Sequence, residues 1–421
     1  MTIIPTPAQL RWQNAGLGLF LHFGINTFNG KEWSDGTLDP ATFNPTELDA
    51  RQWVATAMAA GARYVVFTAK HHDGFCLWPT RTTDYSVASS PWQNGDGDVV
   101  GDLADACREA GIGLGLYLSP WDRNAACYDA PEAYDAFYIR QLIELCTRYG
   151  PLCEVWFDGA GSEGRTYDWE AIMTVVERHQ PDAMVFNMGR PTIRWVGKED
   201  GLAKDPCWYV TDSTGISIYD DGQVSLDSLR YLPPECDVPI RQNWFWQPDD
   251  AYTLKSRDHL LAIWYRSVGL GAGLLLNVPP DRRGLIDELD HARLLEFSAE
   301  LTRRFGRPYS AELVTLPEAD VIAHFPESVL FDHVELREDL SSGQRITSHT
   351  VLAGDRVLAA GSTVGVRRVH AFEPVTATEL KIHISGDGAA LSAVRVFRTG
   401  NSEVPGVEKL PDVMNEKSAD H

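Results

Sequence analysis

The chain has 421 residues, with 37 Lys and Arg against 59 Asp and Glu, which gives a formal charge of −22 at pH 7. Such an acidic chain argues against nucleic acid or an anionic membrane surface as a partner, and its length exceeds that of one ordinary domain. Residues 1–13 contain no basic start and no apolar run of signal-peptide length, and no later stretch is apolar enough to cross a bilayer. We therefore expect a cytoplasmic protein with a neutral or modestly polar substrate.

Buried strands alternate with helices through the first 190 residues. Strand-like apolar runs lie at residues 17–24, 63–68, 113–121, 153–159 and 183–187. Helical patterns lie between them at residues 46–60, 98–110, 131–148 and 169–179. The first of these helices opens at Thr46 and Glu47, which we interpret as its cap. This alternation indicates βαβ units and a parallel sheet.

The pattern weakens between residues 190 and 247, where we place two further strands near 207–210 and 240–245. A helix at 252–269, a strand at 271–277 and a helix at 286–305 follow. The chain therefore predicts an α/β fold, a (β/α)₈ TIM-like barrel, over residues 1–307. Short alternating runs then predict a small antiparallel β-sandwich over 308–400, and the polar residues 401–421 are expected to be a disordered tail.

Polar residues recur at the predicted strand ends. Asp158 and Gly159 end the apolar run that begins at Cys153, and His22, His71, His72 and Tyr117 end or follow other strands. Asp-Gly is also ordinary turn chemistry, and any one histidine could be a core residue. Their recurrence matters because the carboxyl ends of barrel strands meet on one face, where active sites lie.

Two classes of enzyme use such residues. In a metal-dependent hydrolase, Asp158 with His22, His71 or His72 would bind zinc and activate water, although adjacent histidines on one strand should point to opposite faces. The seven cysteines are scattered without a C-x-x-C pair, so we expect reduced thiols and no zinc site. In a glycosidase, histidines bind sugar hydroxyls while two carboxylates carry out the displacement at the sugar. The thirteen tryptophans favour a sugar-binding pocket. A non-catalytic glycan-binding protein is a third possibility.

Several motifs together resemble the α-L-fucosidases of glycoside hydrolase family twenty-nine. These motifs lie at residues 22–24, 32–33, 70–75, 156–159 and 194–201, in the order found in that family. The resemblance runs from residue 10 to about residue 400 and implies a barrel followed by a β-sandwich, a fucosylated oligosaccharide substrate and no cofactor. Residues 153–160 and 235–241 resemble the branch of the family that acts on branched α-1,3/α-1,4-linked fucose.

The resemblance also implies a retaining double displacement with a role for each matched residue. Asp158 would be the nucleophile and Glu199 the acid/base, with Glu235 and then Glu163 as alternatives. The residues expected to hold fucose are His22, Glu32, Trp33, His71, His72, Tyr117 and Trp156. On chemical grounds we add Trp78 to the sugar pocket, place Trp244 beside the leaving group and expect Asp73 to form a turn or orient a histidine.

Overall fold

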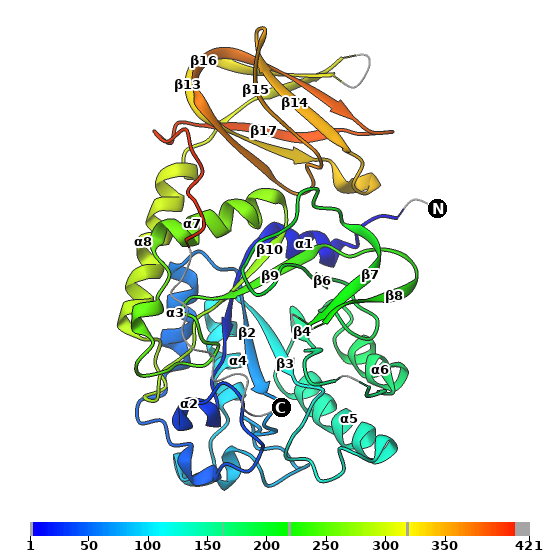
Figure 1. The fold of residues 1–421 in the computed structure, drawn as a ribbon, viewed down its shortest axis with the longest axis vertical. Coiled ribbons are helices and arrows are strands. Elements are labelled where there is room, and N and C mark those ends of the chain that lie inside the picture. The colour runs from blue at the N-terminus through cyan, green and yellow to red at the C-terminus, as the bar shows by residue number, and fades with distance from the viewer. Residues whose placement is uncertain (1–2, 163, 218–219, 317–319, 409–421) are drawn as a thin grey trace.

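A parallel barrel forms the first part of the molecule (Figure 1). The computed structural model describes residues 3–162, 164–217, 220–316 and 320–408. Eight parallel strands follow the order β5-β4-β3-β2-β1-β10-β9-β6. They are β1 (Leu17–Leu21), β2 (Tyr64–Lys70), β3 (Gly113–Leu118), β4 (Glu154–Trp156), β5 (Met184–Phe186), β6 (Arg194–Trp195), β9 (Pro234–Pro239) and β10 (Gly273–Asn277). A parallel bridge between Phe186 and Ile193 joins β5 to the segment before β6, so the sheet is nearly closed. The predicted barrel is confirmed.

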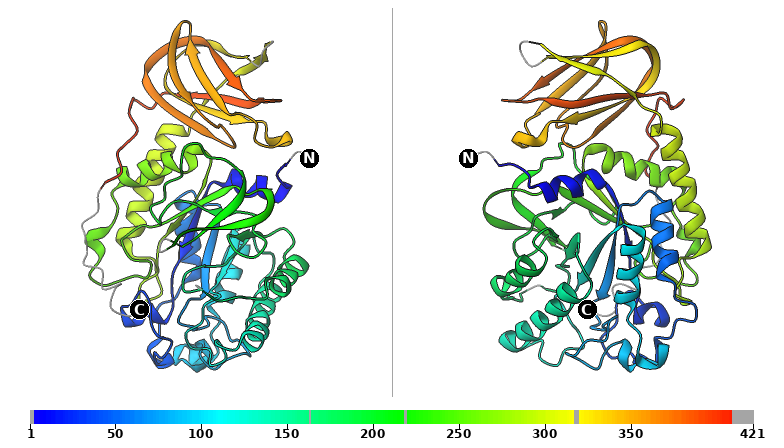
Figure 2. Two further views of the ribbon diagram at one scale, coloured as in Figure 1. Left: turned by 45° about the vertical axis from the view of Figure 1, so that its right-hand side comes forward. Right: turned by 180° about the vertical axis from the view of Figure 1, so that it is seen from behind.

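Helices surround the sheet (Figure 2). They are α3 (Ala50–Ala59), α4 (Val99–Ala110), α5 (Pro131–Arg148), α6 (Trp169–His179), α7 (Arg257–Arg266) and α8 (Glu288–Phe305). The prediction that the first of them opens at Thr46 is wrong. It begins at Ala50 because the carboxylate of Asp49 accepts hydrogen bonds from the backbone N–H groups of Arg51 and Gln52.

Two short helices were not predicted, α1 (Pro7–Ala15) and α2 (Ile25–Asn29). Thr6 and Gln9 form a capping box that begins α1. The indole Nε1 of Trp12 in this helix donates to Glu154 Oε2, 3.1 Å away, at the first residue of β4. Helix α1 therefore closes the amino-terminal end of the barrel.

The second half of the barrel differs from the prediction. Strand six is the two-residue β6 rather than a strand at 207–210, and strand seven is β9 rather than a strand at 240–245. Strands β7 (Val210–Ser217) and β8 (Asp220–Tyr231) instead pair antiparallel in a separate sheet outside the barrel. The apolar pattern predicted these two strands wrongly for two reasons. Strand β6 is too short to show the two-residue alternation of a strand, and β9 directs Glu235 and Asp237 into the barrel interior, where apolar residues are usual.

Beyond α8 the chain forms one antiparallel sheet of seven strands around its own apolar core. The strands are β11 (Tyr309–Ser310), β12 (Glu312–Thr315), β13 (Asp320–Glu338), β14 (Ser348–Ala353), β15 (Arg356–Gly361), β16 (Arg368–Ser385) and β17 (Leu391–Phe397). The long strands β13 and β16 pair through two irregularities in register, and Figure 1 shows them curving. These irregularities interrupt the strict alternation of inward and outward residues along both strands.

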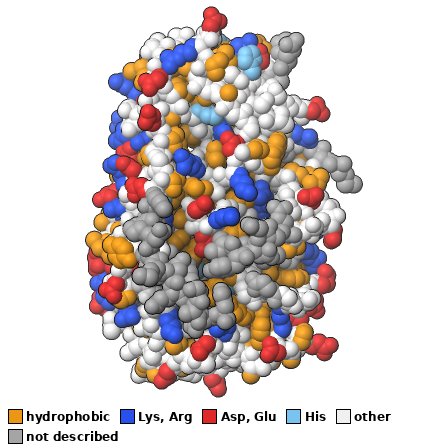
Figure 3. Space-filling model, viewed as in Figure 1, with side chains coloured by type: hydrophobic (Ala, Val, Ile, Leu, Met, Phe, Trp, Pro, Cys, Tyr) orange, Lys and Arg blue, Asp and Glu red, His pale blue; other side chains and the backbone are white. Residues whose placement is uncertain are grey.

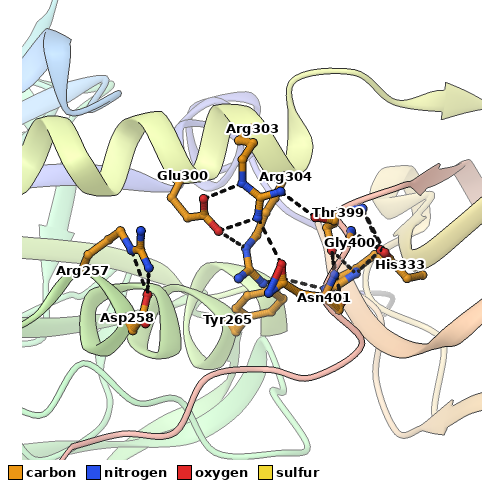
Figure 4. A network of polar contacts seen from close by, with 11 residues as sticks. Arg257, Asp258, Tyr265, Glu300, Arg303, Arg304, His333, Thr399, Gly400 and Asn401 are labelled. Atoms are coloured by element: carbon orange, nitrogen blue, oxygen red, sulfur yellow. Dashed lines mark hydrogen bonds and ion pairs between the residues drawn. The ribbon is translucent and has the colours of Figure 1, made fainter.

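The antiparallel sheet packs against the amino-terminal end of the barrel. The hydroxyl of Tyr209 donates to the carbonyl of Gly271, just before β10 begins, and accepts from the N–H of Val366 in the sheet region. On α8, Arg303 donates to the carbonyl of Thr399, and the hydroxyl of Tyr265 in α7 lies 2.7 Å from Nε2 of His333 (Figure 4). The carboxyl ends of the barrel strands therefore lie at the far end of the molecule from the sheet.

Acidic and basic side chains are interspersed on the face drawn in Figure 3. All seven cysteines are free, as expected. Among the described residues, no helix combines the length and apolar character needed to span a membrane. Of the predicted tail, residues 401–408 are described, and Glu408 accepts a hydrogen bond from Ser256 at the start of α7. Residues 409–421 lie outside the described part of the chain.

Candidate active site

The barrel interior is built in layers because alternate residues of each strand point inward. Phe20, Tyr117, Trp156 and Phe186 belong to one buried cluster inside the sheet. Asp158 lies two residues beyond Trp156, after the end of β4. Its carboxylate therefore occupies the layer at the carboxyl ends of the strands, and its side chain is 25% exposed.

Polar groups surround this carboxylate. The hydroxyl of Tyr117 donates to Asp158 Oδ2 at 3.0 Å, and Nε2 of His72 lies 3.5 Å from the same oxygen. The other oxygen accepts from the backbone N–H of Ala160 at 2.9 Å. Burial and the charge of Asp158 raise the pKa of Tyr117 well above its usual value, so the phenol keeps the proton that it donates.

Three neutral histidines line the same end of the barrel. Burial lowers the pKa of His22 and of His72 to about 3 and that of His71 well below its usual value. Nδ1 of His22 lies 2.9 Å from Oδ1 of Asn277, and Nδ1 of His72 lies 2.7 Å from Oγ of Ser119. At neutral pH each imidazole is therefore one donor and one acceptor, which suits sugar hydroxyls.

The expectation that His71 and His72 point to opposite faces is wrong. Their ring centroids lie 4.2 Å apart. Strand β2 ends at Lys70, so the alternation of a strand no longer applies to them. Asp73 forms a turn through a 2.7 Å bond from the N–H of Phe75 to its Oδ1, and its Oδ2 lies 3.9 Å from Nδ1 of His71.

Glu32 and Trp33 enter the site from the loop after α2. The carboxylate of Glu32 accepts from the backbone N–H groups of Trp244 and Phe245, at 2.9 and 3.1 Å. These bonds therefore connect the loop after α2 to the loop that contains Trp244, 212 residues further along the chain. The ring of Trp33 lies 5.3 Å from that of His72 and 5.6 Å from that of Trp121. These indoles form an aromatic wall beside His72.

Glu199 follows β6 in a strained backbone conformation. Its φ angle is 57°, in the left-handed region that residues other than glycine rarely adopt. The indole Nε1 of Trp244 donates to Glu199 Oε2 at 3.1 Å. Such strain persists where the surroundings hold the residue in place, and it recurs at functional sites. Trp244 in turn lies beside His22, with ring centroids 5.0 Å apart.

The remaining predicted residues lie at different depths. The ring of Trp156 stacks on that of Tyr117, with centroids 5.3 Å apart, whereas Glu235 is fully buried beneath Trp156. Trp78 is also fully buried, and its Nε1 donates to Glu144 Oε2 of α5 at 2.7 Å. Trp78 is therefore a residue of the core between sheet and helices and does not join this group. Glu163 lies outside the described residues.

A family model described as alpha-L-fucosidase matches residues 37–304. The chain belongs to the α-L-fucosidase family. It is 41% identical to alpha-L-fucosidase 1 of Arabidopsis thaliana, over 88% of this chain and 82% of the relative. A solved glycoside hydrolase 29 family member from an unknown rumen bacterium is 33% identical, with a TM-score of 0.85 over 98% of this chain and 79% of that one. The glycoside hydrolase 29 fucosidase of Ruminococcus gnavus in complex with fucose is 28% identical, with a TM-score of 0.82 over 94% and 95% of the two chains.

Three polar residues of this fucosidase-family barrel were missed. Asn277, the last residue of β10, contacts His22 and donates from Nδ2 to the carbonyl of Trp244 at 2.8 Å. Ser119 follows β3 and holds His72. Both could have been found, because each lies at or near the end of a predicted strand. Asp237 accepts from Nε1 of Trp195 at 2.7 Å, and it was missed because β9 was placed too late in the chain.

The metal-dependent alternative requires side chains that converge on one point. Among the described residues, no three His, Cys, Asp or Glu side chains gather in a way that could hold a metal ion. His22 and His72 instead each direct Nδ1 toward an oxygen of a neighbouring Asn or Ser. The Nδ1 atoms of these two imidazoles are thus occupied by protein oxygens.

Proposed function

We propose that this α-L-fucosidase releases L-fucose from oligosaccharides or glycoconjugates by an exo-acting, retaining double displacement. The observation that carries the proposal is the carboxylate of Asp158. It lies partly exposed at the carboxyl ends of the barrel strands, with the hydroxyl of Tyr117 and Nε2 of His72 on one of its oxygens. The hydroxyl of Tyr117 and the backbone N–H of Ala160 donate to its two oxygens, and such donors favour the ionised, oriented carboxylate that a nucleophile requires.

In the first step, Asp158 attacks the anomeric carbon of fucose and the bond to the leaving oxygen breaks. Glu199 protonates that oxygen and then removes a proton from the water that hydrolyses the fucosyl-enzyme. The 3.1 Å bond from Trp244 Nε1 to Glu199 and the left-handed backbone at Glu199 support this role, because both hold the carboxyl in one place. A retaining pair of carboxyls stands about 5–5.5 Å apart during the reaction.

The chemistry of the surrounding residues suits fucose. His22, His71 and His72 offer neutral imidazoles to the ring hydroxyls. Trp156, stacked between Tyr117 and Phe186 with its Nε1 on Glu235, offers the apolar edge of its indole to the sugar and its C6 methyl group. The resemblance of residues 153–160 and 235–241 to the branched-substrate group supports a preference for α-1,3/α-1,4-linked branched fucose. Trp244, on the Glu199 side, is proposed to line the leaving-group site.

The test compares an aryl α-L-fucoside with a branched Lewis-type trisaccharide and a linear α-1,2-linked fucoside, for wild type, Asp158→Ala and Glu199→Ala. We expect fucose release by wild type, with the initial product an α-anomer. Asp158→Ala should lose about 10⁴-fold or more in kcat, since the covalent route is removed. Glu199→Ala should lose far less on the activated aryl substrate than on the trisaccharide, and azide should accelerate it.

Each alternative leaves a different signature. Initial release of the β-anomer would contradict the retaining mechanism. Azide acceleration of a Glu235→Ala variant, with none for Glu199→Ala, would move the acid/base to Glu235. Faster cleavage of the linear substrate than of the branched one would contradict the proposed linkage preference. No fucose release from any substrate, together with binding of L-fucose, would favour the glycan-binding alternative.

A further inference from the structure

The amino-terminal layer of the barrel interior is polar, although branched apolar residues usually fill such layers. Glu154 of β4, Glu235 of β9 and Tyr64 of β2 meet there beneath Trp12 of α1. The hydroxyl of Tyr64 donates to Glu235 Oε2 at 3.0 Å, and Nε1 of Trp12 donates to Glu154 Oε2 at 3.1 Å. Both glutamates are 0% exposed. A buried polar layer costs folding free energy unless its groups are paired, whereas an apolar layer would fill the same space without that requirement. Packing alone therefore does not explain why this layer is polar.

Glycines on neighbouring strands leave room for this layer. A Cβ atom on Gly18 of β1 would lie 2.4 Å from the ring of Tyr64. A Cβ atom on Gly115 of β3 would lie 3.0 Å from Cβ of Glu154. Larger side chains at these inward positions would displace the phenol and the carboxyl. The strands on both sides of Tyr64 therefore accommodate the polar group.

The layer is connected to the proposed sugar pocket through one indole. Oε1 of Glu235 accepts from Nε1 of Trp156 at 3.1 Å. The ring of Trp156 stacks on Phe186, with centroids 3.9 Å apart, and on Tyr117. Tyr117 donates to the carboxylate of Asp158. A continuous series of contacts thus leads from Glu235 to the proposed nucleophile.

The protonation of the two glutamates fits an acceptor role for Glu235. Burial raises the pKa of Glu235 to about 7, and hydrogen bonds from Trp156 and Tyr64 oppose that rise. Burial and the charge of Glu235 raise the pKa of Glu154 well above its usual value. Burial raises the pKa of Glu154 more strongly, so Glu235 is the member of the pair that more readily carries the charge and accepts the hydrogen bonds of Trp156 and Tyr64.

We infer that Glu235 is a positioning residue that fixes the indole of Trp156 beneath the bound sugar, with Glu154 as its buried neighbour. This inference rests on the proposed fucosidase function. Glu154 and Asp158 are four residues apart on one extended segment, a span of about 13 Å. Glu235 lies in the layer of Glu154, so it is too deep to be the second carboxyl of a retaining pair, which needs about 5–5.5 Å.

The experiment is a double-mutant cycle on Glu235 and Trp156, read as kcat and KM on an aryl α-L-fucoside and as the dissociation constant of L-fucose by calorimetry. Glu235→Gln keeps an acceptor for Trp156 but cannot act as an acid, so it should retain activity within about threefold. Glu235→Ala leaves the indole N–H unpaired and should raise KM and the dissociation constant about tenfold, with a smaller change in kcat. On a Trp156→Phe background, Glu235→Ala should add little.

A matched control is Glu144→Ala, which removes the carboxylate that accepts from Trp78. This variant breaks the same kind of indole–carboxylate bond in the core outside the sheet, so it should lower Tm without changing KM. If Glu235→Ala does not fold, Glu235→Gln and Trp156→Phe still complete the test.

Three outcomes would overturn the inference. They are azide acceleration of Glu235→Ala, loss of activity in Glu235→Gln as complete as in Glu235→Ala, and equal effects of Glu235→Ala with and without the Trp156 indole. A wild type that neither cleaves the fucoside nor binds L-fucose would instead overturn the proposed function on which the inference rests. Normal wild-type turnover with additive effects would overturn this inference alone.

Discussion

At the residue scale, the geometry of the site depends on single hydrogen bonds to charged groups. Tyr117 is buried, its pKa is raised, and its hydroxyl donates to Asp158. Removing one donor from an ionised carboxylate leaves the rest of the pocket in place. The effect of that donor on the reaction can therefore be measured separately from the effect of the fold.

We expect Tyr117→Phe to lower kcat/KM about tenfold to a hundredfold, because a hydrogen bond to a charged group stabilises by about 1.5–3 kcal/mol. The measurement is the hydrolysis of an aryl α-L-fucoside. Tyr149→Phe is the matched control, since the hydroxyl of Tyr149 donates to Asp98 at the start of α4. Tyr149→Phe should lower Tm and leave kcat/KM unchanged. Equal losses in both variants would show that Tyr117 acts only through stability.

At the scale of elements, strand β4 and the two residues after it carry three inward residues with different roles. Glu154 lies at its amino end in the polar layer, Trp156 forms part of the aromatic interior, and Asp158 follows its carboxyl end. The period of two residues along an extended chain places them in successive layers. The element thus links the stability of the amino-terminal end to the chemistry at the opposite end.

Glu154→Gln should make the protein more stable, and increasingly so as the pH rises from 5 to 8. The folded pKa of Glu154 is raised well above the value of 4.5 expected in the unfolded chain, so the folded state holds a proton that the unfolded state releases. The contribution of Glu154 to the unfolding free energy of the wild type is therefore largest below pH about 4.5, and it is lost as the pH rises toward the folded pKa. Glutamine keeps the acceptor for Trp12 without this penalty.

The measurement is Tm of wild type and variant across that pH range. Exposed Glu132 at the start of α5 provides the control, because Glu132→Gln removes a carboxylate from the surface and should change Tm only slightly. A stability gap for Glu154→Gln that shrinks on going from pH 5 to pH 8 would mean that Glu154 is ionised in the folded protein.

At the scale of the whole molecule, the antiparallel sheet and the proposed active site lie at opposite ends of the barrel (Figures 1 and 2). Leu340, Val366 and Val369 from the sheet region extend the apolar core of the barrel. The sheet therefore contributes to stability through the amino-terminal end of the barrel, far from the carboxyl ends of the strands.

Tyr209→Phe tests this separation. The variant leaves the buried carbonyl of Gly271 and the N–H of Val366 without their partner, at a cost of about 1–3 kcal/mol in unfolding free energy. We expect a lower Tm in calorimetry with an unchanged KM and kcat at 25 °C. Tyr252→Phe, at an exposed position, should change neither quantity. A changed KM in Tyr209→Phe would show that the two ends of the molecule are coupled.

Taken alone, the sequence determined the barrel and the strand-end residues, because both follow from local patterns. Apolar runs alternating with helices specify a parallel sheet, and Asp158, His22 and Tyr117 lie within or directly after such runs. The chemistry of these side chains, with the motifs around them, pointed to a glycosidase. Local patterns could not predict the irregular second half of the barrel. The two-residue β6 is too short to show the alternation of a strand, and β9 carries two inward carboxylates.

Only the tertiary structure decided how deep each residue lies. Glu235, Trp78 and Glu199 are all plausible site residues by composition. The first is fully buried beneath Trp156, the second lies in the core outside the sheet, and the third contacts Trp244 in the loops at the carboxyl ends. Depth depends on strand register and on loops that meet across the barrel. Contacts between residues far apart in the chain set both, and no local pattern records them.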